Sequence, residues 1–463
     1  MLNTANSFKK IPSFLIKIMM GLFLLVLIAG QLFLKREQFN WLLGWQVTLY
    51  GLLFFLFKQR ESFTLQQLII VGAVARVVSA FCMPTLSDDV YRFVWDGQLI
   101  HSGNNPLLST PDTFLQQISL VNNTHYTYFL ALHKLINHPQ YFTCYPPLMQ
   151  LFFWVGSICG GFNVTTNIII IKLLIALVDI GCIVVIARLL PYFKLPVSMV
   201  ILYAFNPSVI VEGSGNAHFE VVQVAFICLS IYMVVTQKFV AGAAVFGVAI
   251  ITKLIPILLL PLWVRYFGWK KGIAFCLIAC AITITSFLPF INAAFLQGFS
   301  KSIGLYFQAF EFNASLYYVA REIGFIEKGF NYISVIGPLL MVRFLSIYAI
   351  IFFVWRKIST QQLATLGMVL LSVFYALSTT VHPWYIINIL PFALLANRVY
   401  VVVWAGIAFV SYNAYQHLVF NENIYWLVVE YITIFVAIIS NKLIIAKQTN
   451  FINTHPASVK NRK

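Results

Sequence analysis

The sequence has few charged residues and very few acidic ones. Only 10% of the residues are charged and 14 of 463 are Asp or Glu, whereas 60% are hydrophobic. A soluble domain carries about 45–50% apolar and about 25% charged residues, so this composition excludes a water-soluble globular fold. The chain instead contains recurring apolar runs that approach or reach the roughly 20 residues of a membrane-spanning helix.

The chain also lacks a soluble domain and a cysteine motif. Its longest polar segments are 84–146, 293–331 and the tail after residue 447. The seven cysteines form no CxxC pair and lie mainly in apolar segments, where cysteine is typical as a small apolar side chain. A disulfide between Cys82 and Cys144, which flank the first polar segment, remains open as an alternative.

These features predict an all-α fold: a polytopic transmembrane bundle of about 13 helices that forms one integral-membrane domain over residues 1–463. Helices are expected because a segment in lipid must satisfy its own backbone hydrogen bonds. The candidate crossings are 14–34, 40–57, 65–83, 167–190, 195–211, 218–236, 238–254, 255–266, 272–292, 332–355, 361–379, 384–397, 399–419 and 424–446.

The net charge of +16 comes from Lys and Arg that lie mostly at segment ends. This pattern indicates membrane topology and anionic lipid contact, not nucleic-acid binding. It places the basic tail 447–463 in the cytoplasm and the loops 84–146 and 293–331 on the opposite side. Lys35 and Arg36 are the exceptions, because this assignment puts them on the outer side. With that assignment, the apolar stretch 147–162 must dip into the membrane or lie at its surface without crossing.

Three of the rare acids, Asp88, Asp89 and Asp96, fall within nine positions beside a membrane-length segment. We expect an interfacial helix over 88–101 that ends near Gly103. Its apolar residues fall roughly on one side, and its aromatic residues are available at the headgroup level. Those residues are Val90, Phe93, Val94 and Leu99 on the apolar side, with Tyr91 and Trp95 as the headgroup aromatics.

A capped helix start is one explanation of Ser87, Asp88 and Asp89. It accounts for one acid, however, and not for two neighbours together with Asp96 in so acid-poor a chain. Paired carboxylates have two common chemical uses: one acts as a general base toward a hydroxyl, or both bind a divalent metal. The spacing does not distinguish Asp88 from Asp89 as the base.

The acidic segment resembles the first extracytoplasmic loop of bacterial GT-C glycosyltransferases, in particular the mannosyltransferase-like members. The resemblance rests on "DDVYRFVWDGQLIHSGNNPL" (88–107), followed in the same order by "YPPLMQ" (145–150), "NPSVIVEGSGNAHFE" (206–220), "TKLIPILLLP" (252–261) and "VHPWYIINILP" (381–391). It implies a helical membrane enzyme that takes a sugar from a polyprenyl phosphate with inversion, on the extracytoplasmic face. It also implies that Asp88 or Asp89 is the catalytic base, in the catalytic loop 84–146, without a cofactor; a divalent metal is possible but not expected.

Departure of a lipid phosphate builds negative charge that cations or N–H groups must stabilise. Lys253 ends an apolar segment on the predicted outer side, where it either contacts the phosphate or extends toward water. Arg92 either has the same role or pairs with Asp88 at i,i+4. The remaining candidates for substrate binding come from the family-like blocks and from the loop 293–331: Asp96, Asn105, Tyr145, His218, Glu220, Arg321, His382 and Trp384.

For several of these residues a structural role is an equal alternative. His218 and Glu220 are consistent with a capped helix start, Trp384 with a membrane-interface aromatic, and Arg321 with an amphipathic interfacial helix. Arg76 lies inside an apolar segment, where an unpaired charge is costly. We expect it to form a structural pair with Asp179.

Two classes of function compete. The first is an inverting glycosyltransferase of the bacterial inner membrane that moves a hexose from a polyprenyl-phosphate donor to a glycan, lipid or protein acceptor; the resemblance implies that the hexose is mannose. The second is a lipid-linked sugar flippase or secondary transporter, which would place its ionisable residues near the bilayer midplane, usually in repeated halves. No repeat is visible and the acids cluster in a loop, so the sequence favours the transferase. An accessory subunit with a degenerate site is a third option, against which the presence of both aspartates argues.

Overall fold

Helices form nearly all of the regular structure in the computed structural model, which describes residues 12–119, 125–291, 298, 310–417 and 419–454. Within these ranges there is no β-strand, and the only extended pairing is one bridge between Phe312 and Thr380. The all-α prediction is confirmed. Parts of the predicted loops 84–146 and 293–331, and residues 455–463 of the predicted tail, lie outside the described residues.

Among the described residues, six helices are long and apolar enough to cross a membrane, judged by length and composition. Each of them overlaps one of the predicted crossings. Local sequence explains where such helices start: the Asn163 side chain, for example, accepts a hydrogen bond from the backbone N–H of Thr166 and so caps α8. The six are α1 (Ser13–Phe33), α2 (Phe39–Lys58), α8 (Val164–Leu189), α14 (Trp269–Phe287), α17 (Ile333–Val354) and α21 (Ile424–Thr454).

Other predicted crossings are shorter or broken. The segment 195–211, expected as one helix, bends by 55° between residues 204 and 207. Pro207 has no N–H to donate and Asn206 caps a new helix by accepting from the N–H of Val209. Prolines also interrupt other segments, which continue as short helices. The shorter helical elements, with or without such a proline, are α3 (Leu65–Phe81), α7 (Pro147–Gly160), α9 (Ile201–Ala204), α10 (Pro207–Ile210), η4 (Val211–Gly215), α11 (Glu220–Val235), α12 (Phe239–Thr252), η5 (Ile255–Leu259), α13 (Leu260–Phe267), α18 (Thr360–Ala376), η7 (Pro383–Asn388), α19 (Leu390–Leu395), α20 (Tyr400–Ile407) and η8 (Ala408–Tyr415).

Among the described residues, six helices are thus long enough to cross, or seven if the bent pair is one span. Eight further apolar helices, α7 among them, are shorter than this, so the expected total of about 13 crossings stays a prediction. The same holds for the expectation that 147–162 does not cross.

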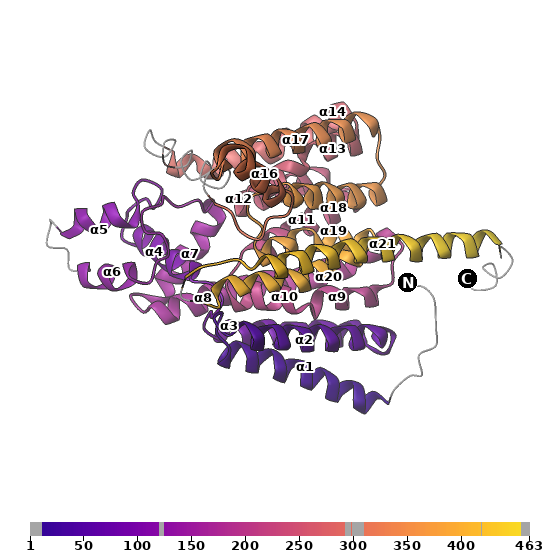
Figure 1. The fold of residues 1–463 in the computed structure, drawn as a ribbon, viewed down its shortest axis with the longest axis horizontal. Helices are drawn as coiled ribbons and strands as arrows, with labels where there is room; N and C mark the ends of the chain where they lie inside the picture. The colour runs from indigo at the N-terminus through magenta and orange to yellow at the C-terminus, as the bar shows by residue number, and fades with distance from the viewer. Residues whose placement is uncertain (1–11, 120–124, 292–297, 299–309, 418, 455–463) are drawn as a thin grey trace.

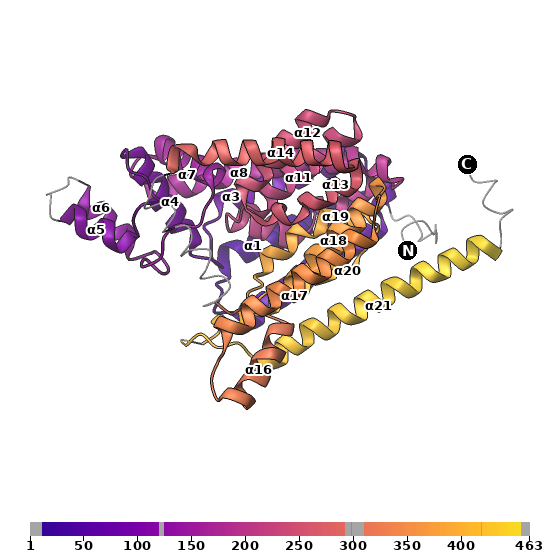
Figure 2. The same ribbon diagram turned by 90° about the horizontal axis from the view of Figure 1, so that it is seen from above.

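Three helices of the first polar segment gather at one end of the bundle, which we call the loop end. Figures 1 and 2 show α4 (Asp89–His101), α5 (Pro111–Ser119) and α6 (Tyr126–His133) together at the left. α21 begins beside α16 (Leu316–Lys328) and runs toward the opposite end (Figure 2). Segments that are far apart in the sequence are thus brought together at the loop end.

α4 is the helix expected over 88–101, and it ends before Gly103, whose φ of 79° suits glycine. Its surroundings differ from the prediction, however. Trp95 is fully buried and packs edge-on against the rings of Phe114 and Phe129 instead of lying at a headgroup level. α4 packs along α7 and is covered by protein on nearly every side, so it is not a helix with a single buried face.

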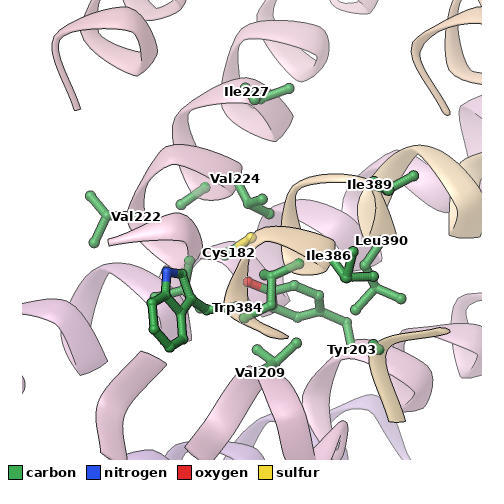
Figure 3. Packing of buried hydrophobic residues seen from close by; sticks show 14 of the residues in the cluster. Cys182, Tyr203, Val209, Val222, Val224, Ile227, Trp384, Ile386, Ile389 and Leu390 are labelled. Atoms are coloured by element: carbon green, nitrogen blue, oxygen red, sulfur yellow. The ribbon is translucent and has the colours of Figure 1, made fainter. Parts of the chain in front are cut away.

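The core lies where α8, α11 and the 383–395 region meet. Arg76 and Asp179 are both fully buried there: the Arg76 Nε donates to Asp179 at 2.6 Å, and the Tyr203 hydroxyl donates to the other carboxylate oxygen at 2.6 Å. The predicted structural pair is confirmed. The seven cysteines all lie within the described residues and none of them forms a disulfide, so the Cys82–Cys144 disulfide is not formed. Figure 3 shows the apolar packing in this core, with Cys182, Tyr203, Val209, Val222, Val224, Ile227, Trp384, Ile386, Ile389 and Leu390 labelled.

Candidate active site

The two neighbouring aspartates at the start of α4 have different surroundings. The carboxylate of Asp88 lies 2.7 Å from Nη1 of Arg36, which comes from the α1–α2 turn, and it also accepts from Asn137 at 3.3 Å. Asp88 is the N-cap residue, but its side chain makes no capping hydrogen bond. Asp89 has no such ion pair with Arg or Lys: among the described residues the nearest basic side chain is that of His218, whose Nε2 lies 4.0 Å from the Asp89 carboxylate. Asp89 is therefore the carboxylate left available for a ligand.

His218 is held beside Asp89 by a buried acid. Its Nδ1 lies 3.1 Å from Oε2 of Glu212, which is fully buried in the π-helical turn η4. The other Glu212 oxygen accepts from the hydroxyl of Tyr412 at 2.9 Å. The Nε2 of His218 is buried, faces Asp89 and has no hydrogen-bond partner in the described part of the chain. Glu212 thus orients the imidazole toward the free aspartate.

His218 also belongs to a row of stacked rings. The centre of its ring lies 3.7 Å from the centre of the Trp384 ring. The centres of the Trp384 and His382 rings are 4.3 Å apart, with an angle of 3° between the ring planes. Trp384 is only 8% exposed, so it is not an interface-belt aromatic. Burial, with the neighbouring His218 and Lys253, lowers the pKa of His382 to about 3. His382 is therefore neutral at physiological pH and can donate a hydrogen bond but carries no positive charge.

A cavity of about 140 Å³, here called the acidic cavity, opens over both aspartates. Its wall combines the two carboxylates with polar and aromatic side chains from the 137–145 segment. The lining residues used below are Asp88, Asp89, Asn137, Tyr141, Cys144 and Tyr145.

A second cavity, of about 230 Å³, lies on the other side of Cys144 and Tyr145, which line both. This apolar cavity contains one charged pair: Nζ of Lys253 lies 2.5 Å from Oε1 of Glu220. Lys253 therefore has an acidic partner, which the sequence did not indicate. The second oxygen of Glu220 is buried and has no partner among the described residues. The cavity thus presents a cation and a free hydrogen-bond acceptor within an otherwise apolar wall.

Arg92 and Asp96 are held in a structural network. Arg92 does not pair with Asp88: its Nε donates to Asp96 at 2.8 Å and its Nη1 donates to the carbonyl of Tyr141 at 2.9 Å. The fully buried Asp96 also accepts from Thr143 at 2.6 Å and from Gln150 at 3.1 Å. This network fixes α4 against the 141–150 segment, and with it the wall of the acidic cavity.

Two predicted substrate-binding residues lie away from the aspartates. Asn105 follows α4, whose 13 residues span roughly 20 Å, and it donates to the carbonyl of Phe290 at 3.3 Å. Arg321, on α16, pairs with Glu311 at 2.8 Å and with Glu322 at 2.9 Å. Neither residue lines the acidic or the apolar cavity.

Arg36 and Glu212 are site residues that the sequence reasoning did not select. Each carried a signal: Arg36 was a basic residue on the predicted outer side, against the charge trend, and Glu212 stands in the family-like block that contains His218. Local spacing does not reveal that Arg36 reaches Asp88, 52 positions further along the chain, because only the fold brings these loops together. Within the described residues, no group of three or more His, Cys, Asp or Glu side chains has the geometry of a metal site.

Comparison with known sequences identifies the family of the chain. Residues 15–268, more than half of the chain, match the family described as "Alpha-(1->6)-mannopyranosyltransferase, N-terminal domain". The chain belongs to this alpha-(1->6)-mannopyranosyltransferase family. A curated member, Alpha-(1->6)-mannopyranosyltransferase A of Corynebacterium glutamicum, is 24% identical over 241 residues. That match covers 47% of this chain and 45% of the relative, so the chain spans less than half of the relative's length.

The region of the alpha-(1->6)-mannopyranosyltransferase match contains most of the site. Asp88, Asp89, Glu212 and His218 lie inside it, as does the Lys253–Glu220 pair. His382 and Trp384 lie beyond it and complete the stacked row of rings. No solved structure matches this chain.

Proposed function

We propose that this protein is an inverting membrane glycosyltransferase that moves a hexose, in the first instance mannose, from a polyprenyl-phosphate donor to the hydroxyl of an acceptor glycan. The observation that carries the proposal is the placement of Asp89: its carboxylate, which among the described residues pairs with no Lys or Arg and lies 4.0 Å from His218, lines the acidic cavity. That cavity shares the Tyr145 wall with an apolar cavity containing Lys253. Family membership and the name of the curated relative support glycosyl transfer and mannose as the sugar.

In this proposal the lipid phosphate occupies the apolar cavity. Lys253 stabilises the negative charge that develops on the leaving phosphate, and the neutral imidazole of His382 adds an N–H donor nearby. The free oxygen of Glu220 accepts a hydrogen bond from a hydroxyl of the donor sugar, because a buried acceptor without a partner is costly until a ligand supplies one.

The acceptor hydroxyl enters from the acidic cavity. Its oxygen attacks the anomeric carbon on the face opposite the phosphate, the bond from that carbon to the phosphate oxygen breaks, and the hydroxyl proton passes to Asp89. Glu212 and His218 act as positioning residues that orient Asp89. Asp88 is excluded from the base role in this scheme because Arg36 already neutralises its charge. The loop end faces the outside of the bacterial inner membrane, as the distribution of basic residues predicts.

Transport of a lipid-linked sugar is less well supported. A transporter would use ionisable groups within its spanning helices, yet the Arg76–Asp179 pair in this chain is buried and fully engaged with Tyr203 and backbone carbonyls. That arrangement is typical of a structural pair.

The test is transfer by purified protein in lipid nanodiscs, with radiolabelled polyprenyl-phosphate mannose, glucose and arabinose offered with mannoside acceptors. We expect mannose transfer that persists in a metal chelator. Asp89→Asn should reduce it at least about 100-fold, while Asp112→Asn, an acid of the same loop outside both cavities, should leave it unchanged. Full activity of Asp89→Asn, or no transfer of any of the three sugars by the unmodified protein, contradicts the proposal.

A further inference from the structure

A third hollow at the loop end lies outside both cavities of the candidate site. It has a volume of about 280 Å³ and is formed between α16 and the segment that leads into α21. A neighbouring hollow of about 270 Å³ shares residues 421–424 with it, so this short strip is bordered by hollows on two sides. We call the two together the polar hollow. Its residues used below are Glu311, Arg321, Phe420, Asn421, Glu422 and Asn423.

The charged groups of the polar hollow are fixed by one another and are not free surface charges. Glu311 accepts from Arg321 at 2.8 Å, from Tyr317 at 2.6 Å and from Asn331 at 3.0 Å. Glu422 accepts from the backbone N–H of Asn313 at 2.6 Å and from the hydroxyl of Tyr318. The carboxylates and the guanidinium are therefore preorganised before any ligand arrives.

Groups that remain available lie on the strip itself. The side-chain amide of Asn421 has no hydrogen-bond partner within the described ranges, and the exposed amide of Asn423 uses only its oxygen, which accepts from the N–H of Tyr425 at 3.0 Å. An amide both donates and accepts, which suits vicinal hydroxyls. The ring of Phe420 beside them is 52% exposed and offers an apolar face. Fixed charges, free amides and one open ring together suit a neutral polyhydroxylated ligand better than an ion.

Contacts link the polar hollow to the aspartates. The guanidinium of Arg36, which holds Asp88, lies 5.1 Å from the centre of the Tyr415 ring, and that ring lies 5.5 Å from the ring of Phe420. A second route passes from Phe420 to Phe312 at 6.0 Å and from Phe312 to His382 at 4.7 Å. The side chains of Arg36 and Tyr415 thus connect the hollow to Asp88, and the ring of Phe312 connects it to His382.

We propose that the polar hollow is a carbohydrate subsite that binds sugar residues of an oligosaccharide acceptor beyond the residue whose hydroxyl reacts at Asp89. The reaction at Asp89 in this inference rests on the proposed function, whereas the binding of sugar residues in the polar hollow does not. A chain of sugars anchored here would present its end to the acidic cavity, so the hollow would set a preference for longer acceptors over monosaccharides.

The test compares a methyl mannoside with a mannotetraose acceptor, using the full chain in nanodiscs with polyprenyl-phosphate mannose. Phe420→Ala and Asn421→Ala should each raise KM for the tetrasaccharide roughly tenfold, while KM for the lipid donor and kcat/KM for the methyl mannoside stay unchanged. Glu327→Gln, an exposed acid of α16 outside the hollow, is the matched control and should change none of these values. Equal losses on both acceptors, or no change on either, overturn the proposal.

Direct binding separates this inference from the proposed function. Mannotetraose should bind the Asp89→Asn protein in calorimetry, and adding Phe420→Ala should weaken that binding roughly tenfold. If this binding is observed but the unmodified protein transfers no sugar, the transferase is rejected and the subsite is kept. Transfer that is indifferent to Phe420 and Asn421, with calorimetric binding unaffected, would keep the transferase and reject the subsite.

Discussion

Arg36 and Asp88, from two different loops, form an ion pair of 2.7 Å at the start of α4. This pair distinguishes two adjacent acids that the sequence leaves equivalent. Both carboxylates line the acidic cavity, but Arg36 neutralises only that of Asp88, which is the arrangement that a single general base requires.

Removing either member of the Arg36–Asp88 pair leaves an unpaired charge next to Asp89, whereas removing both leaves none. We therefore expect Arg36→Gln and Asp88→Asn each to slow transfer a few-fold. The double variant should be no slower than the slower single one, with a coupling energy of about 0.5–1 kcal/mol for this partly exposed pair. Transfer rates of the four proteins give the cycle, with Lys35→Gln as the control for loss of a neighbouring charge. Loss of transfer in Asp88→Asn alone, similar to that in Asp89→Asn, would instead identify Asp88 as the base.

Lys253 is expected to act on the lipid phosphate. Lys253→Ala should raise KM for the polyprenyl-phosphate donor roughly tenfold or more, because hydrogen bonds to charged groups contribute about 1.5–3 kcal/mol. KM for the acceptor should be unaffected. Lys134→Ala, which removes a lysine near α6 outside both cavities, serves as the control. A rise in acceptor KM with unchanged donor KM would refute the phosphate role.

His382 should make the fold sensitive to acid. Its pKa is lowered to about 3, while in the unfolded chain it lies near 6.5. Between these values the unfolded state binds the extra proton, so stability is lost as the pH falls from about 6.5 toward 3. Thermal unfolding in detergent at pH 7 and pH 4.5 should show a smaller loss of Tm on acidification for His382→Gln than for the unmodified protein. Identical losses would show that His382 does not contribute.

The Arg76–Asp179 pair should be structural. Asp179→Asn leaves a fully buried guanidinium without its counter-charge, which costs about 3–5 kcal/mol in buried pairs, and the variant should unfold at a clearly lower temperature. The double variant Arg76→Met with Asp179→Leu should recover much of that loss and retain transfer. If the stable double variant transfers no sugar, the pair has a functional role that the structure does not assign to it.

Much of the fold could be predicted from local sequence. Continuous apolar runs predicted helices, Gly103 marked the end of α4, and the cost of a charge in an apolar segment predicted that Arg76 pairs with Asp179. Breaks were less well predicted: the segment 195–211 bends because of Asn206 and Pro207, although its hydrophobicity is that of one helix. Trp95 was placed at a headgroup level because composition does not report which neighbours cover a helix.

The sequence by itself determined that acids are rare and that three of them gather at the start of α4 and within it, because scarcity and spacing are local properties. Tertiary structure alone decided what each acid does. Arg36 neutralises Asp88, His218 with Glu212 faces Asp89, and Glu220 accompanies Lys253. These partners are separated by 6 to 129 positions and meet only through packing. The charge environment of a group depends on distances in space, which residue spacing along the chain does not contain.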